Sequence, residues 1–526
     1  MPLLRSLFRT GLATCLTLLL FSAPASGAKR LSITRDQLRD KVLGGWAGKI
    51  IGVQYGQPYE FHYLARTKDD EIAWDADYVQ GAIGQDDIYT QMSFMGTLDR
   101  YGLDASADQL ADAFAHAGFM LFHANLQGRK NYFDGLRPPL TGSARYNAHA
   151  DDIDFQIDAD FIGFMCPGMP RTARRYCDRI GPIMNDGDGI YGGLYIATLH
   201  TLAFFDDDIP RIVETSLRNI PRKSAYARCL RDVLGQYKKD PDDWRAAWQI
   251  VHEKWEPHVC TPNHPFNIDA KMNGAYVTIG LLYGHGDLDK TIEIAIRCGQ
   301  DADCNPSNAA AVWGIINGFE KLPDRYKEAL APIADVPFAY TDYSFTQATD
   351  KVMEFMETNV RRGGGHIEGD RFLIKRQPCR FRGRCVQSFP GMRYQASVDA
   401  DDPAWTYTGA WNTFTEEHDN AVYHETYEPG ATAEISFEGQ MVTLIGAWDA
   451  DGGRADVFID GKLQRRIDSY ISYRCGFSVI NREVLFVASG LKPGRHTLKI
   501  AVVDEKNPDS TGNHLMFTRI DTYAKP

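Results

Sequence analysis

The sequence contains two pairs of aspartates whose spacing indicates metal chemistry. Asp301 and Asp303 are two positions apart, and Asp86 and Asp87 are adjacent. Each pair leads into residues with helical apolar periodicity, so each is predicted to lie on a short loop at the start of a helix. Short loops rich in carboxylate oxygens suit a hard divalent cation. If the two loops converge in the fold, their side chains would hold one or two divalent ions.

A structural explanation of the same aspartates is also open. Acidic side chains at the start of a helix accept hydrogen bonds from free backbone N–H groups and interact favourably with the helix dipole. In this explanation Asn305 is an N-cap and Pro306 occupies the first helical position. Either pair alone fits it, whereas two pairs with flanking glycines favour a cation site.

Around these pairs the sequence resembles the ADP-ribosylglycohydrolase family, in a secreted bacterial branch. The family has an early Thr-Asp-Asp-Thr type motif and a late Gly-Asp-Thr-Asp-Thr type motif, which correspond here to residues 85–88 and 300–304. A glycine-rich opening at 44–52, followed by Pro-Tyr-Glu at 58–60, matches as well. The resemblance extends over about residues 38–322. It implies an all-α catalytic domain that hydrolyses a glycosidic bond with Mg²⁺ or Mn²⁺, and carboxylate ligands would also accept Ca²⁺.

The resemblance also implies roles for individual residues. Glu60 is the expected acid or base, and Asp87 is expected to take part in catalysis as well as in metal binding. From the residues alone, Glu60 would equally be a solvated loop residue, and the Asp-Gly-Asp-Gly stretch at 186–189 would equally be a turn. The residues expected to hold the metal are Asp86, Asp87, Asp301 and Asp303. The residues expected to contact the substrate are Gln85, Asp152, Asp154, Asn185, Asp186, Asp188 and Asn305.

The two motifs depart from the family at a few positions. Gln85 and Ile88 replace hydroxyl residues, and Cys304 stands where a threonine ligand is usual, although Asn305 could supply an oxygen. A site with one ion is therefore an alternative to a site with two. The departures also support a second hypothesis, a secreted glycan-binding protein with an inactive hydrolase domain. The retention of all four aspartates opposes that hypothesis.

The expected substrate is a small molecule or glycan with a ribose-like pentofuranosyl group, cleaved at an N- or O-glycosidic bond. A metal could orient the cis-hydroxyls of such a sugar and deliver the attacking water. The net charge of −12 is unhelpful for a pyrophosphate ligand, so true ADP-ribosyl hydrolysis is the alternative. The same charge argues against a nucleic acid polymer or an anionic membrane as partner. The oligomeric state is left undetermined.

The helix that must position the early motif begins near Thr34. Thr34 and Gln37 have capping-box spacing, and Leu38 and Trp46 fall on one face of the predicted helix. Glycines crowd this helix after Gly44. They allow close packing against another helix and close approach of the backbone to a ligand; both are expected, with packing as the main cause.

Residues 1–28 have the pattern of a secretory signal peptide. Arg5 and Arg9 precede an apolar run, and small residues follow up to a predicted cleavage after Ala25 or Ala28. No later apolar stretch is long enough to span a bilayer. The mature protein is therefore expected to be soluble and to be secreted, into the periplasm or outside the cell.

Cysteine and histidine spacing does not indicate a zinc motif. The sequence has no Cys-x-x-Cys pair and no histidine cluster with the spacing of zinc ligands. Cys379 and Cys385 are close together in a basic segment. Because export would place them in an oxidising compartment, we predict a disulfide between them.

From about residue 390 the apolar periodicity changes to two. Short strand-like runs, with an Asp-Gly hairpin signal at 460–461, predict an antiparallel β-sandwich that resembles galactose-binding-like modules. Its aromatic residues could stack on sugars or fill the sandwich core; the residues in question are Trp405, Tyr407, Trp411 and Trp448. The predicted organisation is a signal peptide at 1–28, an all-α ADP-ribosylglycohydrolase-like catalytic domain at 30–360, a linker at 361–389 and a β-sandwich module at 390–526.

Overall fold

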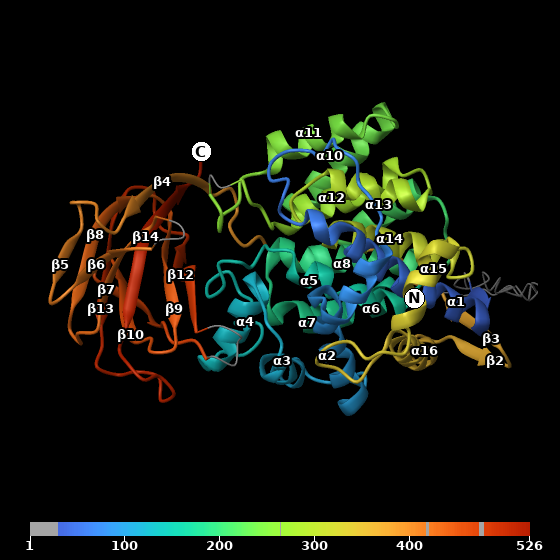
Figure 1. Ribbon diagram of the computed structural model, residues 1–526, viewed down its shortest axis with the longest axis horizontal. Helices are drawn as coiled ribbons and strands as arrows, with labels where there is room; N and C mark the ends of the chain where they lie inside the picture. Colours follow the sequence, from blue (N-terminus) through green and yellow to red (C-terminus); the bar gives the residue numbers. More distant parts are fainter. Residues whose placement is uncertain (1–29, 263–264, 417–419, 473–477) are drawn as a thin grey trace, which may run out of the picture.

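The computed structural model describes residues 30–526 except 263–264, 417–419 and 473–477. The chain is multidomain, because a helical domain is followed by antiparallel β-sheets, which confirms the predicted fold class (Figure 1). The predicted signal peptide lies outside the described residues. Among the residues that are described, no helix combines the length and the apolar character that crossing a membrane requires.

The helical domain packs around a core formed by helices that are buried along nearly their whole length. Three of these are α8, α12 and α14, whose side chains meet other helices on every face. The helices are α1 (Arg35–Gly56), α2 (Asp86–Tyr101), α3 (Ala107–His116), α4 (His123–Phe133), α5 (Asp154–Ile157), α6 (Asp160–Phe164), α7 (Pro170–Ile180), α8 (Gly187–Ala203), α9 (Ile209–Ser216), α10 (Ala225–Lys239), α11 (Trp244–Trp255), α12 (Ala270–Tyr283), α13 (Leu288–Arg297), α14 (Cys304–Asn317), α15 (Asp324–Leu330) and α16 (Phe345–Arg362).

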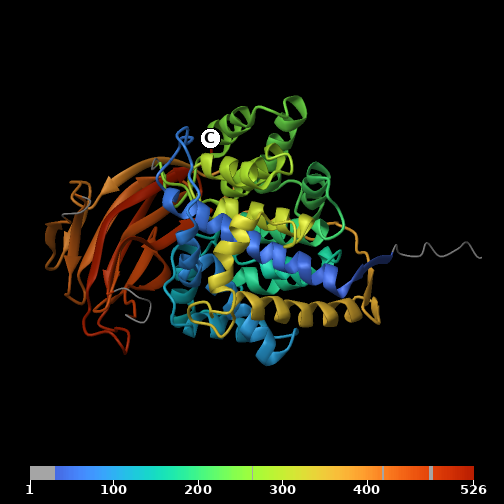
Figure 2. The same cartoon turned by 45° about the vertical axis from the view of Figure 1, so that its right-hand side comes forward.

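Helices α1 and α14 lie side by side (Figures 1 and 2). A stripe of glycines brings α1 into backbone contact with α14 and the loop before it. The stripe consists of Gly44, Gly48, Gly52 and Gly56, four residues apart on one face of α1. A Cβ atom added at any of them would lie 2.0–2.4 Å from a backbone oxygen of the facing segment. The packing explanation of these glycines is therefore confirmed. The contact fixes the register of α1 on α14 and places the end of α1 beside the late acidic motif.

Part of the predicted linker is ordered into strands. β2 (His366–Glu368) pairs with β3 (Arg371–Lys375), and β3 pairs with β1 (Arg30–Thr34), in the order β1-β3-β2. Phe372 of β3 is buried in the core of the helical domain. The prediction of an irregular segment at 361–389 is wrong for these strands, because their short apolar alternation is obscured by the surrounding arginines and glycines.

The C-terminal sheets form a sandwich. One has the order β11-β10-β13-β8-β5 and the other β12-β9-β14-β7-β6, with β4 paired to β14. Asp460 and Gly461 have φ values of +52° and +72°, as a tight two-residue turn between β10 and β11 requires. Trp405 and Trp448 are 6% and 2% exposed, which favours the core role for these two rings. The strands are β4 (Arg393–Asp399), β5 (Thr406–Thr408), β6 (Asn412–Thr415), β7 (Val422–Thr426), β8 (Thr432–Glu438), β9 (Met441–Asp449), β10 (Arg454–Ile459), β11 (Lys462–Asp468), β12 (Val479–Ser489), β13 (Arg495–Val502) and β14 (Leu515–Ala524).

The sandwich rests directly on the helical domain. The Tyr523 hydroxyl of β14 donates a hydrogen bond to the carbonyl oxygen of Val259, at 2.5 Å. A cavity of about 350 Å³ lies between the two domains, with Asp188 and Lys271 on the helical side and Phe389 and Arg393 on the other.

Two local predictions are corrected by the structure. Cys379 and Cys385 are free thiols, as are the other described cysteines, so the predicted disulfide is wrong. Cys379 packs against the core whereas Cys385 is exposed. Helix α14 begins at Cys304, and its N-cap is Asp303, whose side chain accepts a hydrogen bond from the Cys304 N–H. Asn305 is therefore not the N-cap, because the helix begins one residue before it.

The glycine stripe gives a first prediction. Gly48→Ala is expected to lower the free energy of unfolding by about 1–3 kcal/mol, because the new methyl group overpacks the interface with α14. The added Cβ atom would lie 2.2 Å from the carbonyl oxygen of Ala310. The matched control is Gly235→Ala in α10, where no heavy atom lies within 4 Å of the added Cβ. The control should stabilise the helix by about 0.5–1 kcal/mol. Denaturant unfolding of both variants would measure the difference, and equal effects would contradict the packing argument.

Candidate functional site

The acidic loop between α13 and α14 is held in a left-handed backbone conformation. Gly299 and Gln300 have φ values of +75° and +56°. The Phe61 N–H donates to the Gln300 carbonyl oxygen, and the Gln300 N–H donates to the Tyr63 carbonyl oxygen, both at 3.0 Å. These hydrogen bonds fix the late motif against the segment that carries Glu60.

Carboxylates from three segments converge at this loop. One oxygen each from Glu60, Asp301 and Asp303 lie within 4.8 Å of one another. Asp303 belongs to a second such group with Asp87, at the start of α2, and the Cys304 thiol. The structure therefore brings the two sequence motifs close to each other and to the glutamate that follows the glycine-rich helix.

The centre is electrostatically unbalanced. Burial, with Asp303 and Asp86 nearby, raises the pKa of Glu60 to about 9. Burial and the neighbouring Asp87 raise the pKa of Asp86 to about 7, and burial and Asp303 raise the pKa of Asp301 well above its usual value. Asp87 forms an ion pair with a basic side chain, that of Lys49. Among the described residues, the other carboxylates of the centre form no such pair. A cation would remove their mutual repulsion.

The donor atoms differ between the two groups. Glu60, Asp301 and Asp303 offer carboxylate oxygens alone, which are the ligands that Mg²⁺, Mn²⁺ and Ca²⁺ prefer. The second group includes the Cys304 thiol, which donates a hydrogen bond to Asp87 Oδ2 at 2.9 Å. Sulfur is a poor ligand for hard cations. The all-oxygen group is therefore the better match for a hard divalent ion.

Lys49 is a functional candidate that the sequence analysis did not identify. Its side chain is fully buried, and Nζ lies 2.8 Å from Asp160 Oδ2 and 3.3 Å from Asp87 Oδ1. Nζ also lies within hydrogen-bonding distance of the Ser307 hydroxyl on α14. Although burial disfavours the charged form, Asp160 and Asp87 raise the pKa of Lys49 above its ordinary value. The sequence signal that could have identified it is a lysine on the glycine-rich helix. Such a helix is expected to pack closely, so a charged residue on its buried side needs buried partners.

Gln85 and Asn305 lie at the edge of the centre. The Gln85 side chain accepts a hydrogen bond from the Asp86 N–H at 2.8 Å and donates one to Asp303 Oδ2 at 3.1 Å, so it links the two motifs. Asn305 donates from Nδ2 to Asn273 Oδ1 at 2.9 Å. The buried Asn305 Oδ1 has no hydrogen-bond partner among the described residues, so this acceptor remains available.

The predicted substrate contacts at 185–188 have local structural partners. Asn185 accepts a hydrogen bond from the Phe155 N–H and donates to two backbone carbonyls, and Asp186 is the N-cap of α8. Asp188 lines the cavity between the domains. No contact among the described residues joins these three side chains to the carboxylates around Asp303, so their role in substrate binding stays a prediction.

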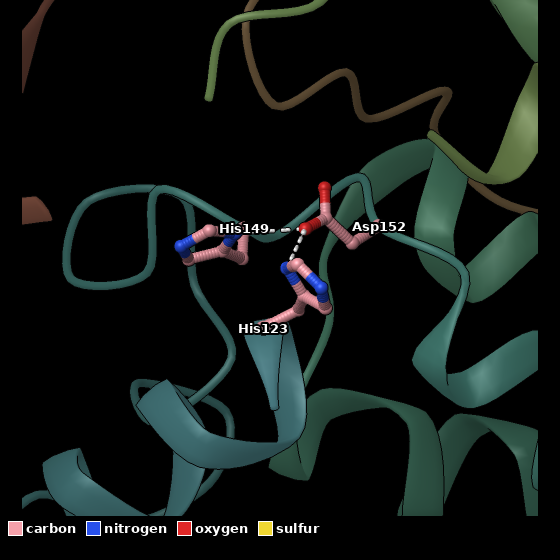
Figure 3. Close-up of side chains that lie close together, drawn as sticks. All are labelled: His123, His149 and Asp152. Carbon is pink, nitrogen blue, oxygen red and sulfur yellow. Dashed lines mark hydrogen bonds and ion pairs between the residues drawn. The ribbon is translucent and has the colours of Figure 1, made fainter. Parts of the chain in front are cut away.

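Asp152 lies in a histidine cluster that sequence spacing did not reveal. His149 Nδ1 lies 2.8 Å and His123 Nδ1 3.7 Å from Asp152 Oδ2 (Figure 3). His258 Nε2 lies 2.9 Å from Asp152 Oδ1. Although burial opposes ionisation, His258 and His149 hold the pKa of Asp152 below its usual value. For Asp154 nearby, burial and Asp152 raise the pKa to about 7.

The buried lysine gives a second prediction. Lys49→Met is expected to destabilise the protein by about 3–5 kcal/mol, because it leaves two buried carboxylates without their cation. The matched control is Lys254→Met, which removes a solvent-exposed pair with Asp232 and should cost about 0–1 kcal/mol. Denaturant midpoints of both variants would test this. A Lys49→Met protein as stable as the control would show that the buried pairing does not hold the centre together.

Three comparisons with known proteins bear on the family. A model of the family described as ADP-ribosylglycohydrolase matches residues 34–359. Over 111 residues the chain is 32% identical to an A type blood N-acetyl-α-D-galactosamine deacetylase of Flavonifractor plautii. That match covers 20% of this chain and only 13% of the relative.

Two solved structures are also similar to parts of the chain. An ADP-ribosylglycohydrolase-related protein complex is 13% identical, with 62% of this chain and 99% of that chain covered and a TM-score of 0.39. A family 35 carbohydrate binding module from Clostridium thermocellum is 12% identical, with 24% of this chain and 97% of that chain covered and a TM-score of 0.19.

The family match spans both acidic motifs and the lysine that pairs with the first of them. It covers more than half of the chain and ends near the last residues of α16. This protein therefore belongs to the ADP-ribosylglycohydrolase family.

Proposed function

We propose that the helical domain is a divalent-metal-dependent hydrolase that cleaves an N- or O-glycosidic bond of a ribose-like pentofuranosyl substrate. Membership of the ADP-ribosylglycohydrolase family supports hydrolysis of a glycosidic bond. The observation that carries the proposal is the convergence of Glu60, Asp301 and Asp303 at one all-oxygen centre. The surplus of carboxylates there is what a divalent cation would neutralise.

The proposed ligands are Asp301 and Asp303, with Asp86 and Asp87 from α2. When bound, a divalent ion would orient the sugar hydroxyls and supply an activated water. Because Asp87 also pairs with Lys49, its second role is to hold the start of α2 in place. Mg²⁺ and Mn²⁺ are the proposed ions, with Ca²⁺ as the alternative, and the thiol in the second group favours one ion over two.

Glu60 is the proposed acid or base. Before a cation binds, burial and the carboxylates of Asp303 and Asp86 raise the pKa of Glu60 to about 9, so this group would hold a proton near neutral pH. The protonated form is the one that a leaving group at the glycosidic oxygen or nitrogen needs. The hydrogen bond from the Phe61 N–H to the acidic loop holds the neighbouring Glu60 in position.

The proposed leaving group is a sugar or a base. The protein itself is proposed to be exported. The signal-peptide pattern at 1–28 supports export, where glycans and nucleosides are available. The 111-residue match to an enzyme named for a blood-group amino sugar supports a glycan setting. We propose that the β-sandwich contributes to glycan binding.

Metal removal gives a third prediction. Chelation should abolish turnover, and one added divalent ion should restore it. Asp301→Asn should lower activity by roughly 100-fold or more, because it removes a ligand. The same variant should be at least as stable as the wild type without metal, because one repelling carboxylate is gone. Melting curves with and without Mg²⁺ would then show stabilisation in the wild type but not in the variant.

The matched control for this experiment is Asp324→Asn. Asp324 is 90% exposed at the start of α15, away from the centre. It should change neither turnover nor the response to Mg²⁺. Full metal-dependent activity in Asp301→Asn would refute the assignment of the site, and metal binding without turnover of any glycoside would favour a binding protein.

A substrate panel gives a fourth prediction. The enzyme would be offered nucleosides, aryl pentofuranosides, ADP-ribosyl-arginine and O-acetyl-ADP-ribose under one metal condition. We expect release from pentofuranosides or nucleosides, with the Asp301→Asn variant as the control for each active substrate. Efficient cleavage of the ADP-ribosyl compounds with none of the others would establish true ADP-ribosyl hydrolysis instead.

A further inference from the structure

A second group of donor atoms lies where the two domains meet. His123 is the first residue of α4, and His149 and Asp152 belong to the loop between α4 and α5 (Figure 3). One ring nitrogen each of His123 and His149 and one Asp152 oxygen lie within 4.8 Å of one another. Asp152 also belongs to a second group of this kind, with His258 and Cys260. None of these residues belongs to the acidic centre.

We infer that His123, His149 and Asp152 form a binding site for a divalent transition-metal ion of the zinc type, separate from the acidic centre. Two imidazole nitrogens and one carboxylate oxygen are ligands that Zn²⁺ accepts readily and that Mg²⁺ and Ca²⁺ do not favour. The site goes beyond the proposed hydrolysis, and it would use Asp152 as a metal ligand rather than as the substrate contact that the sequence predicts.

The distances suit an ion at the centre of the group. Ligand atoms around tetrahedral zinc are roughly 3.3 Å apart, given zinc–ligand distances of about 2.0–2.2 Å. The distances from Asp152 Oδ2 to His149 Nδ1 and His123 Nδ1 are 2.8 and 3.7 Å, which lie on either side of that value. Small side-chain rotations would equalise them. His258 Nε2, 2.9 Å from the other oxygen of Asp152, would orient the carboxylate.

The second ring nitrogen of His149 faces the sandwich. Nε2 is buried, and Glu483 Oε2 of β12 lies 3.8 Å from it. With a metal on Nδ1, Nε2 would carry a proton and direct it at Glu483, the carboxylate–histidine arrangement that is usual at zinc sites.

The consequence would be a metal link between the domains. His123, His149 and Asp152 come from the helical domain, and Glu483 comes from the sandwich. An ion that fixes His149 would also fix its contact with Glu483 across the interface. Metal binding to the folded state alone should then raise the thermal stability of the whole chain.

The test is zinc binding by the full chain, purified without a polyhistidine tag. After equilibration with zinc chloride and removal of free metal, we expect about one tightly held zinc per chain by elemental analysis, with a rise in melting temperature. His149→Ala should weaken zinc affinity at least about 100-fold. His116→Ala is the matched control, because His116 is exposed on α3, outside the group, and it should bind zinc as the wild type does.

Two further variants keep the inference falsifiable. If His149→Ala does not fold, His123→Gln replaces a partly exposed ligand at the start of a helix and should also lose zinc. Asp301→Asn should keep the zinc while it loses the response to Mg²⁺, which separates this site from the proposed catalytic one. The absence of stoichiometric zinc in the wild type, or equal zinc in His123→Gln and the wild type, would overturn the inference.

Discussion

The backbone contact between α1 and α14 determines how the acidic centre is built. Four glycines in register leave no room for a side chain between the two helices, so the facing segments approach as closely as backbone allows. Lys49 follows one of these glycines, and its ammonium group reaches the carboxylates of Asp87 and Asp160 from there. At the end of the stripe, Gly56 lies against the backbone of Ala302, inside the acidic loop. A larger residue along the stripe would separate the glutamate and aspartate segments that must meet.

Charge balance then divides the centre into two parts. Lys49 neutralises the part around Asp87 and Asp160 within the protein, at the cost of burying an ammonium group that only these partners make tolerable. Among the described residues, no basic side chain pairs with Glu60, Asp301 or Asp303, and burial and mutual repulsion raise the pKa of Glu60 and Asp301. The first part resembles a structural core and the second a ligand site. This division explains why Asp87 has a basic partner within the protein, whereas Asp301 and Asp303 would take theirs from a bound cation.

Local sequence signals predicted the helices and strands well, but they could not predict which side chains meet across long distances in the sequence. The capping box at Thr34 and Gln37, the hairpin turn at 460–461 and the helical-then-sandwich order follow from short patterns, and each is present. The convergence of the aspartate pairs was predicted only because two motifs point to one site. No local sequence pattern predicts that Lys49 is buried, since burial of a charge depends on partners far away in the sequence. The histidine cluster was missed for the same reason, because His123 and His258 are far in the sequence from the loop that carries His149 and Asp152.

Aromatic contacts connect the acidic centre with the histidine cluster. Phe61, next to Glu60, contacts the ring of Phe266 with centroids 4.7 Å apart, and Phe266 stacks on His123 at 5.5 Å. Beneath them lies an apolar cluster that includes Cys304, the first residue of α14. A metal bound at His123 would hold one end of this series of ring contacts, while the hydrogen bond from the Phe61 N–H to the acidic loop holds the other. The two proposed ions would therefore have different tasks: one would act on the substrate, and the other would fix the aromatic contacts that lead to the acidic loop.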